Sequence, residues 1–207
     1  MSALPHRPAR PLRADAERSM ARILEAAERV FATDPFASME EIATAAGVAR
    51  TTVHRRFSSR DELRDALVSV INAKLREAFA SAHVETAPPL VALYQLTMTT
   101  LDLKADWRAA WQLVDEGTQG IDADIIAELD ALLQRSRDTG LLRRNVDIPW
   151  MRSIYMALIH EAATARDDDD SASGWARLIM QTLLSGIGDE EHDLERLLAD
   201  TRDHTQE

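Results

Sequence analysis

The sequence predicts an all-α protein of about nine helices, from three observations. Apolar residues recur at helical spacing along most of the 207 residues, and no segment shows the alternation of a strand. The seven glycines and seven prolines stand between these periodic segments, where helices end. With 45% hydrophobic and 29% charged residues, the chain has the composition of a globular protein rather than a disordered one.

The first predicted helix covers residues 15–33 and ends before Pro35, because proline disfavours the α conformation in the residue that precedes it. A short second helix begins at Ser38, which pairs with Glu41 in a capping-box pattern, and it ends at Gly47. Gly47 is the only glycine among the first 116 residues, and glycine readily adopts the left-handed conformation of a tight turn.

A third helix is predicted over residues 49–56, and a fourth begins in a second capping-box pattern formed by Ser59 and Glu62. Apolar residues recur at helical spacing through residues 63–79, so the fourth helix is long and amphipathic. Five further helices are predicted, over residues 90–103, 106–117, 122–139, 149–165 and 173–187.

The second and third predicted helices have the pattern of a helix-turn-helix, in which a tight turn joins two short helices. Ala43 is small enough for the two helices to cross closely, and the aromatic Phe57 follows the second of them. Ile42, Val48 and Val53 supply the rest of the inward face. The alternative interpretation is a plain helical hairpin with no role in DNA binding.

The third predicted helix presents a face with hydrogen-bond donors and no carboxylate. The residues expected on this face are Arg50, Thr51, Thr52, His54 and Arg55. Such a face suits the major groove of DNA, where arginine pairs with guanine and threonine contacts the thymine methyl group. Three further residues are expected at the DNA phosphates, namely Ser38, Arg56 and Arg60.

The chain from residue 42 to residue 63 reads IATAAGVARTTVHRRFSSRDEL, and the helix before it ends in AAERVF. Together with its surroundings, about residues 15–70, this segment resembles the N-terminal domain of the TetR/AcrR transcriptional regulators. The resemblance implies a homodimeric repressor whose C-terminal helices bind a small molecule that releases DNA. The family pattern usually has Ser, Gly, Tyr and Lys where this chain has Ala49, Thr51, His54 and Arg60. We therefore expect a weak cap on the third helix.

The charge distribution divides the chain into two modules with different partners. Residues 1–60 hold 10 basic and 7 acidic side chains, whereas residues 61–207 hold 14 basic and 28 acidic ones, for a net charge of −11. We expect a disordered basic arm over residues 1–14 that includes Arg7, Arg10 and Arg13. The helix-turn-helix domain then covers residues 15–60, a connecting helix 61–80, an effector-binding and dimerisation domain 81–188, and a charged tail 189–207.

Two predicted helices are apolar on more sides than one core can cover. They run from Pro149 to Ala165 and from Ser173 to Ile187, and in each the few polar side chains occupy a narrow arc. Pairing with their copies in a second chain, as a four-helix bundle, covers the excess apolar surface. A central place for both helices in a larger core is the alternative.

An effector pocket is expected among the helices between residues 90 and 165, for a small apolar or amphipathic molecule. The candidate residues are Tyr94, Met98, Trp107, Trp111, Gln112, Met151, Tyr155, Met156 and His160. Each of them also fits a plain core role, because large apolar residues are usually buried.

Several function classes find no support in the sequence. The absence of cysteine removes thiol catalysis and Cys-ligated zinc, and His160-Glu161 lacks the second histidine of a zincin because residue 164 is Thr164. We expect no metal, no cofactor and no enzymatic activity. With no apolar run near the ~20 residues of a membrane span and no secretory signal, we expect a cytoplasmic protein.

Two rival functions stay open at this point. One is a DNA-binding protein without an effector, whose C-terminal helices only dimerise. The other is a helical small-molecule-binding protein or enzyme without DNA binding, in which the third helix is buried rather than exposed.

Overall fold

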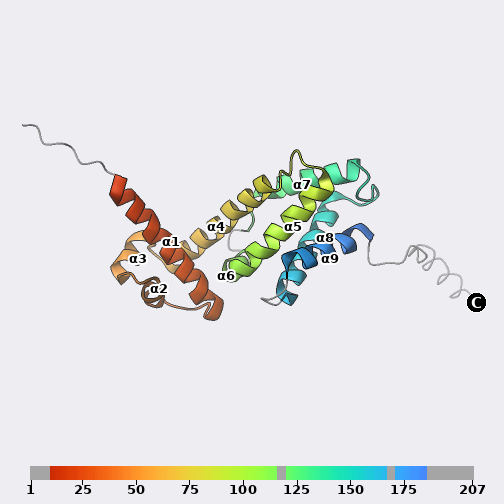
Figure 1. Cartoon of the computed structure of the whole chain (residues 1–207). Helices are drawn as coiled ribbons and strands as arrows, with labels where there is room; N and C mark the ends of the chain where they lie inside the picture. The colour runs from red at the N-terminus through yellow and green to blue at the C-terminus, as the bar shows by residue number, and fades with distance from the viewer. Residues whose placement is uncertain (1–9, 116–119, 167–170, 186–207) are drawn as a thin grey trace, which may run out of the picture. The chain divides into compact units, whose positions relative to one another are not determined.

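The computed structural model describes residues 10–115, 120–166 and 171–185, which form nine α-helices and no strand. Figure 1 shows them in order: α1 (Arg10–Thr33), α2 (Met39–Ala46), α3 (Arg50–Arg56), α4 (Arg60–Ser81), α5 (Pro89–Asp106), α6 (Arg108–Asp115), α7 (Ala123–Asp138), α8 (Ile148–Ala165) and α9 (Ala172–Ser185). The predicted all-α fold is confirmed. The predicted arm is too long, because α1 already begins at Arg10. The predicted charged tail lies outside the described residues.

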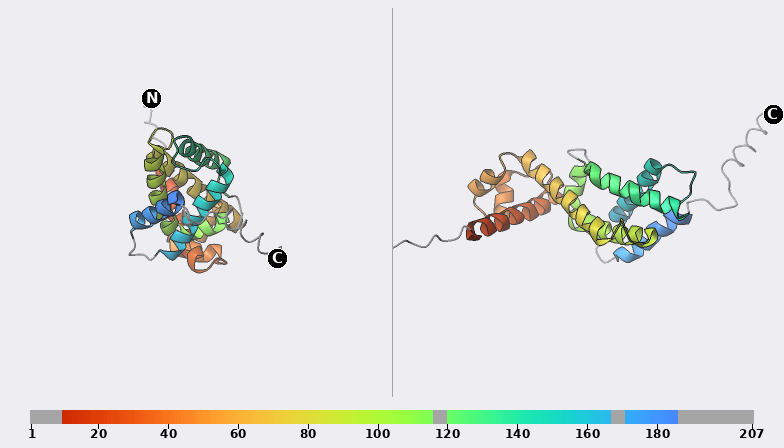
Figure 2. Two further views of the ribbon diagram at one scale, coloured as in Figure 1. Left: turned by 90° about the vertical axis from the view of Figure 1, so that its right-hand side faces the viewer. Right: turned by 90° about the horizontal axis from the view of Figure 1, so that it is seen from above.

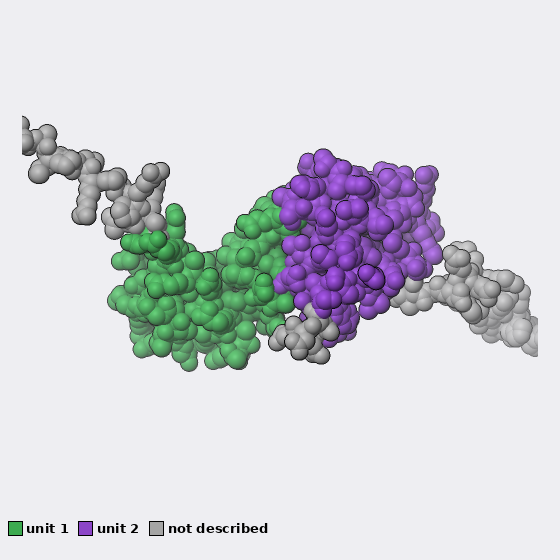
Figure 3. All heavy atoms as spheres, in the orientation of Figure 1, with its two compact units in different colours: residues 1–79, 103–127 green, residues 80–102, 128–207 purple. Residues whose placement is uncertain are grey.

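The chain divides into two compact units (Figure 3). Unit 1 combines Met1–Phe79 with Leu103–Ala127, and unit 2 combines Ala80–Asp102 with Glu128–Glu207. This division differs from the predicted domains, which placed the whole of 81–188 in one domain. The difference arises because α6 and the adjoining ends of α5 and α7 pack with the N-terminal helices.

In unit 1, α1, α2 and α3 lie side by side and share one apolar core (Figures 1 and 2). α1 contributes Ile23 and Phe31, and α4 contributes Leu63 and Leu67, all of which are buried. The four residues follow the helical spacing of their helices, so each helix turns one stripe inward.

α6 is attached to α1 by a buried carboxylate. Glu28 of α1 is 7% exposed, and its two carboxylate oxygens accept the backbone N–H groups of Ala109 (2.7 Å) and Ala110 (2.9 Å). These N–H groups lie in the first turn of α6, where no carbonyl of the same helix is available to them. Burial raises the pKa of Glu28, and the two backbone hydrogen bonds partly oppose this rise.

α4 holds the beginning of α7 through two residues one turn apart. The buried Asn72 donates from Nδ2 to the carbonyl of Gly120 (3.3 Å) and accepts the N–H of Asp122 at Oδ1 (3.0 Å). Arg76 pairs with Asp122 (2.5 Å) and Asp124 (2.9 Å), and its guanidinium lowers the pKa of Asp124. These contacts and Glu28 explain why residues 103–127 belong to unit 1.

In unit 2, α8 and α9 pack against each other, as the views of Figures 1 and 2 agree. The Tyr155 hydroxyl of α8 lies 2.9 Å from the Thr97 hydroxyl of α5, with both residues buried. Burial raises the pKa of Tyr155, so the phenol stays neutral. Of the helices described, none combines the length and apolarity that a membrane crossing requires.

Candidate nucleic-acid interface

A local cap bounds α2 at each end, and the second of these caps makes the turn to α3. Ser38 precedes α2 and accepts the Glu41 N–H at its Oγ (3.3 Å), while the Glu41 carboxylate accepts the Ser38 N–H (2.7 Å), so the predicted capping box is present. Gly47 ends α2 in the left-handed conformation, with φ 63°, and donates its N–H to the carbonyls of Ala43 and Thr44. The predicted role of this glycine is confirmed, because a side chain at this backbone conformation is strained.

The core of the helix-turn-helix fixes α3 by its inward side chains. Ile42, Ala43, Val53 and Phe57 are buried, as predicted, whereas Val48 is only half-buried. Ala49 precedes α3 in an extended conformation and makes no side-chain cap hydrogen bond. The weak cap expected from the resemblance is therefore observed.

α3 presents its basic face to solvent. The exposed residues are Arg50, Thr51, His54 and Arg55, while Thr52 and Arg56 are half-buried. α3 itself contains no carboxylate, and its last turn holds His54, Arg55 and Arg56. The rival function that required a buried third helix is inconsistent with this exposure.

A carboxylate from α2 lies next to this basic face, which the sequence pattern did not predict. Glu40 Oε2 accepts a hydrogen bond from Arg50 Nη1 (3.1 Å), and Arg50 Nε donates to His54 Nε2 (3.4 Å). The Glu40–Arg50 pair is exposed, so its own contribution to stability is small. Ten positions separate the two residues, and only the geometry of the turn brings them together.

Two of the predicted phosphate ligands make contacts within unit 1. The Arg60 guanidinium donates to the Pro35 carbonyl and lies 5.6 Å from the ring centroids of both Phe31 and Phe36. The Ser38 hydroxyl donates to the Glu41 carboxylate (2.8 Å). Binding of DNA phosphates by Ser38 and Arg60 stays a prediction. To bind a phosphate, the Arg60 guanidinium would have to give up its contacts with Pro35, Phe31 and Phe36.

The second predicted capping box has a modified form. Ser59 Oγ accepts the Glu62 N–H (3.1 Å), as predicted for the start of α4. The Glu62 carboxylate, however, accepts both the N–H (2.6 Å) and the O–H (2.7 Å) of Ser58, one residue earlier. These two hydrogen bonds lower the pKa of Glu62.

The structure divides the effector-pocket candidates between the two units. In unit 2, Met151 and Tyr155 are buried, Tyr94, Met98 and Met156 are half-buried, and His160 is exposed. In unit 1, Trp111 is buried beneath the Lys104 ammonium, 4.2 Å from the ring centroid, Trp107 is half-buried, and Gln112 is exposed. Unit 2 thus groups five of the candidates, all on α5 and α8, that are buried or half-buried, whereas unit 1 groups only Trp107 and Trp111 in this way.

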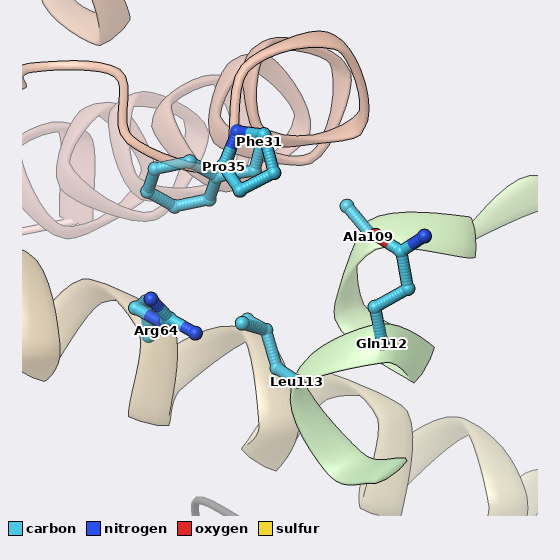
Figure 4. Close-up of a pocket in the computed structure, with 6 residues that line it drawn as sticks. All are labelled: Phe31, Pro35, Arg64, Ala109, Gln112 and Leu113. Carbon is cyan, nitrogen blue, oxygen red and sulfur yellow. The ribbon is translucent and has the colours of Figure 1, made fainter. Parts of the chain in front are cut away.

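Two cavities bear on this question. One, of about 20 Å³, is lined in unit 1 by Phe31, Pro35, Arg64, Ala109, Gln112 and Leu113 (Figure 4). It has room for about one water molecule. The other is a shallow depression of about 200 Å³ on α9, lined by Ser171, Gly174, Trp175 and Leu178. Both are smaller than the 300–1,000 Å³ or so of a typical ligand site.

Comparisons with known proteins agree with this geometry. A family model described as "Bacterial regulatory proteins, tetR family" matches residues 23–67, from the middle of α1 into α4. The transcriptional repressor LfrR of Mycolicibacterium smegmatis is 29% identical over 175 residues, which cover 83% of this chain and 91% of LfrR. Residues 23–67 thus form a domain of the TetR family.

Another relative and a solved structure are similar to the chain over comparable lengths. The transcriptional regulator NfxB of Pseudomonas aeruginosa is 26% identical over 172 residues, covering 80% of this chain and 92% of NfxB. The crystal structure of LfrR in complex with proflavine matches with a TM-score of 0.62 at 29% identity and covers 83% of this chain and 98% of that one.

The TetR-family fold extends over the greater part of the chain. The crystal structure of PfmR from Thermus thermophilus has a TM-score of 0.67 at 21% identity and covers 81% of this chain and all of PfmR, which supports the fold alone. With the helix-turn-helix on α2 and α3 in its TetR-family domain, this chain is a DNA-binding transcriptional regulator.

Proposed function

We propose that this TetR-family chain is a homodimeric repressor that binds an operator through α3 and leaves it when a small-molecule effector binds. The observation that carries the proposal is the exposed face of α3, with Arg50, Thr51, His54 and Arg55 turned to solvent over a buried Val53 and Phe57. We propose that it acts in the cytoplasm, where it binds operator DNA reversibly. Such binding needs no catalytic group, so we infer no enzymatic activity.

DNA recognition by α3 predicts unequal losses for two substitutions. Arg55→Ala is expected to weaken binding to the DNA upstream of the protein's own gene about 5- to 150-fold, because a bidentate contact to guanine discriminates by about 1–3 kcal/mol. Thr52→Ala removes a methyl contact and is expected to cost less. A gel shift measures both, with Arg144→Ala, an exposed arginine of unit 2, as the matched control.

Two outcomes of this gel shift contradict the proposal at different levels. Equal retention by Arg55→Ala, Thr52→Ala and the wild type removes the residue roles but leaves DNA binding. A wild type that retains no duplex contradicts DNA binding itself.

The proposed dimer interface lies on α8 and α9. In the single chain Trp150 is 59% and Leu178 is 51% exposed, and further apolar side chains beside them are half-buried, namely Ile154, Leu158 and Trp175. Trp150, Ile154 and Leu158 are four residues apart on α8, so they form one stripe. A two-fold dimer buries this stripe, and it also offers α3 to two half-sites of DNA.

The proposed effector site lies between α5 and α8 in unit 2. Tyr155 of α8 meets α5 at its hydrogen bond with Thr97. Buried Met151 lies one turn from Tyr155 on α8, and half-buried Tyr94 and Met98 lie within one turn of Thr97 on α5. Methionine and tyrosine side chains repack readily around an apolar ligand. LfrR is known in complex with proflavine, a planar aromatic cation. Residues 61–207 hold 28 acidic and 14 basic side chains, and this negative net charge favours a positively charged effector.

Proflavine itself is therefore the first probe for the effector site. It is expected to raise the melting temperature of the DNA-free protein, with about 2.7 kcal/mol of added stability at a concentration one hundred times its Kd. Circular dichroism follows the transition, and Met151→Ala should reduce the shift, whereas Arg144→Ala should not. A melting temperature unchanged by proflavine contradicts this effector class.

A further inference from the structure

Glu40 is placed where its charge acts on DNA recognition without being part of α3. It lies in the first turn of α2, its side chain is 68% exposed, and its Oε2 atom accepts from Nη1 of Arg50 at 3.1 Å. The adjacent Glu41 differs, because its carboxylate is bound to the N–H and O–H of Ser38. Of this pair of neighbouring carboxylates, Glu40 is thus the one that reaches the recognition helix.

The contact with Glu40 orients the guanidinium of Arg50. Nη1 donates to Glu40, and Nε donates to Nε2 of His54, one turn further along α3. A guanidinium is planar and carries five N–H donors in a fixed fork, so these two contacts fix its plane. Both N–H groups of Nη2 and the second N–H group of Nη1 are then the donors left for a base edge. A side chain held in this way loses less conformational freedom when it binds.

The same carboxylate opposes contact with DNA that lacks a matching base. A negative charge beside the phosphates weakens binding to every sequence, and phosphate contacts supply most non-specific affinity. A guanine that pairs with Arg50 compensates for this repulsion, whereas another base does not. Repulsion of incorrect partners combined with attraction of the correct one is a physical route to specificity.

We propose that Glu40 is a specificity-determining residue of operator recognition that acts by positioning Arg50. The inference rests on the proposed function, since it requires that α3 reads DNA. It goes beyond that function by assigning a role in base discrimination to a residue of α2.

The test compares Glu40→Gln with the wild type on three duplexes. They are a duplex selected by the wild type from a random-sequence pool, its variants with single base-pair changes, and a scrambled duplex of the same length. Glu40→Gln is expected to bind the scrambled duplex more tightly and to lower the ratio of selected to scrambled affinity about 5- to 10-fold. The plot of log affinity against log salt should steepen by about one.

A double-mutant cycle separates positioning from simple charge removal. The base pair read by Arg50 is the one at which Arg50→Ala loses discrimination. In the Arg50→Ala protein, adding Glu40→Gln should leave discrimination at this base pair unchanged. Glu77→Gln, an exposed acid of α4, is the matched control for loss of one negative charge. Circular dichroism checks that every variant is folded.

The outcomes distinguish this inference from the function on which it rests. An unchanged affinity ratio for Glu40→Gln overturns the inference, and so does an equal change in the Arg50→Ala background. A wild type that enriches no sequence overturns the proposed function and the inference together.

Discussion

Replacing Glu28 by alanine is expected to lower the free energy of unfolding by about 2–4 kcal/mol. The substitution removes the carboxylate that accepts the N–H groups of Ala109 and Ala110, and these groups then lie in a buried site without an acceptor. Urea denaturation measures the loss. Glu25→Ala, an exposed glutamate on the same helix, is the matched control. Equal stability of the two variants would show that the Glu28 contact contributes nothing.

The pH dependence of the Glu28 contribution has a definite sign. Because burial raises the pKa of Glu28 above the ordinary value of 4.5, the folded state binds the proton more tightly than the unfolded state. The stability linked to this proton is complete below pH 4.5 and is lost as the pH rises through the folded-state pKa. The wild type should therefore lose stability relative to Glu28→Gln over that interval. A wild type that gains stability relative to Glu28→Gln as the pH rises contradicts the burial argument.

Replacing Leu178 by glutamate is expected to separate the proposed dimer. Leu178 is 51% exposed in the single chain, so the charge does not disrupt the subunit's own core. In a two-fold interface the substitution places two unpaired charges in an apolar contact, which costs about 3 kcal/mol or more and weakens the dimer about 100-fold. Loss of the dimer removes simultaneous contact with two half-sites, so operator affinity should fall with it.

Sedimentation and gel shift test the Leu178 substitution together. Leu90→Glu changes another exposed leucine of unit 2, on α5, and is the control for an added surface charge. The expected result is a Leu178→Glu monomer that fails to retain DNA at concentrations where Leu90→Glu retains it. A Leu178→Glu dimer with wild-type affinity places the interface elsewhere.

The helices and the helix-turn-helix could be predicted because their signals are local. Ser38, Glu41 and Gly47 act through hydrogen bonds or backbone angles within a few residues, so the sequence around α2 contains them in full. Buried Val53 and Phe57 follow from helical spacing once the turn is placed. The same reasoning correctly predicted an exposed basic face on α3.

The features that the sequence did not reveal depend on contacts between distant segments. Glu28 has the appearance of an ordinary surface residue of α1 until α6, about eighty positions away, supplies two N–H groups. Asn72 similarly meets Gly120 only in the folded chain. Arg60 was predicted to bind phosphate, yet the loop before α2 places Phe36 where the guanidinium contacts its ring. In each case the partner is fixed by tertiary packing, which periodicity does not encode.

Selection from a random-sequence pool tests most directly whether two copies of the chain read DNA with α3. The wild-type protein is incubated with the pool, bound duplexes are amplified, and the enriched sequence is footprinted. We predict an inverted repeat whose half-sites are centred about 34–36 Å apart, one turn of the DNA helix. A pool that yields no enriched sequence, or one whose enriched sequence is a single half-site bound by a monomer, would contradict DNA recognition by two copies of α3.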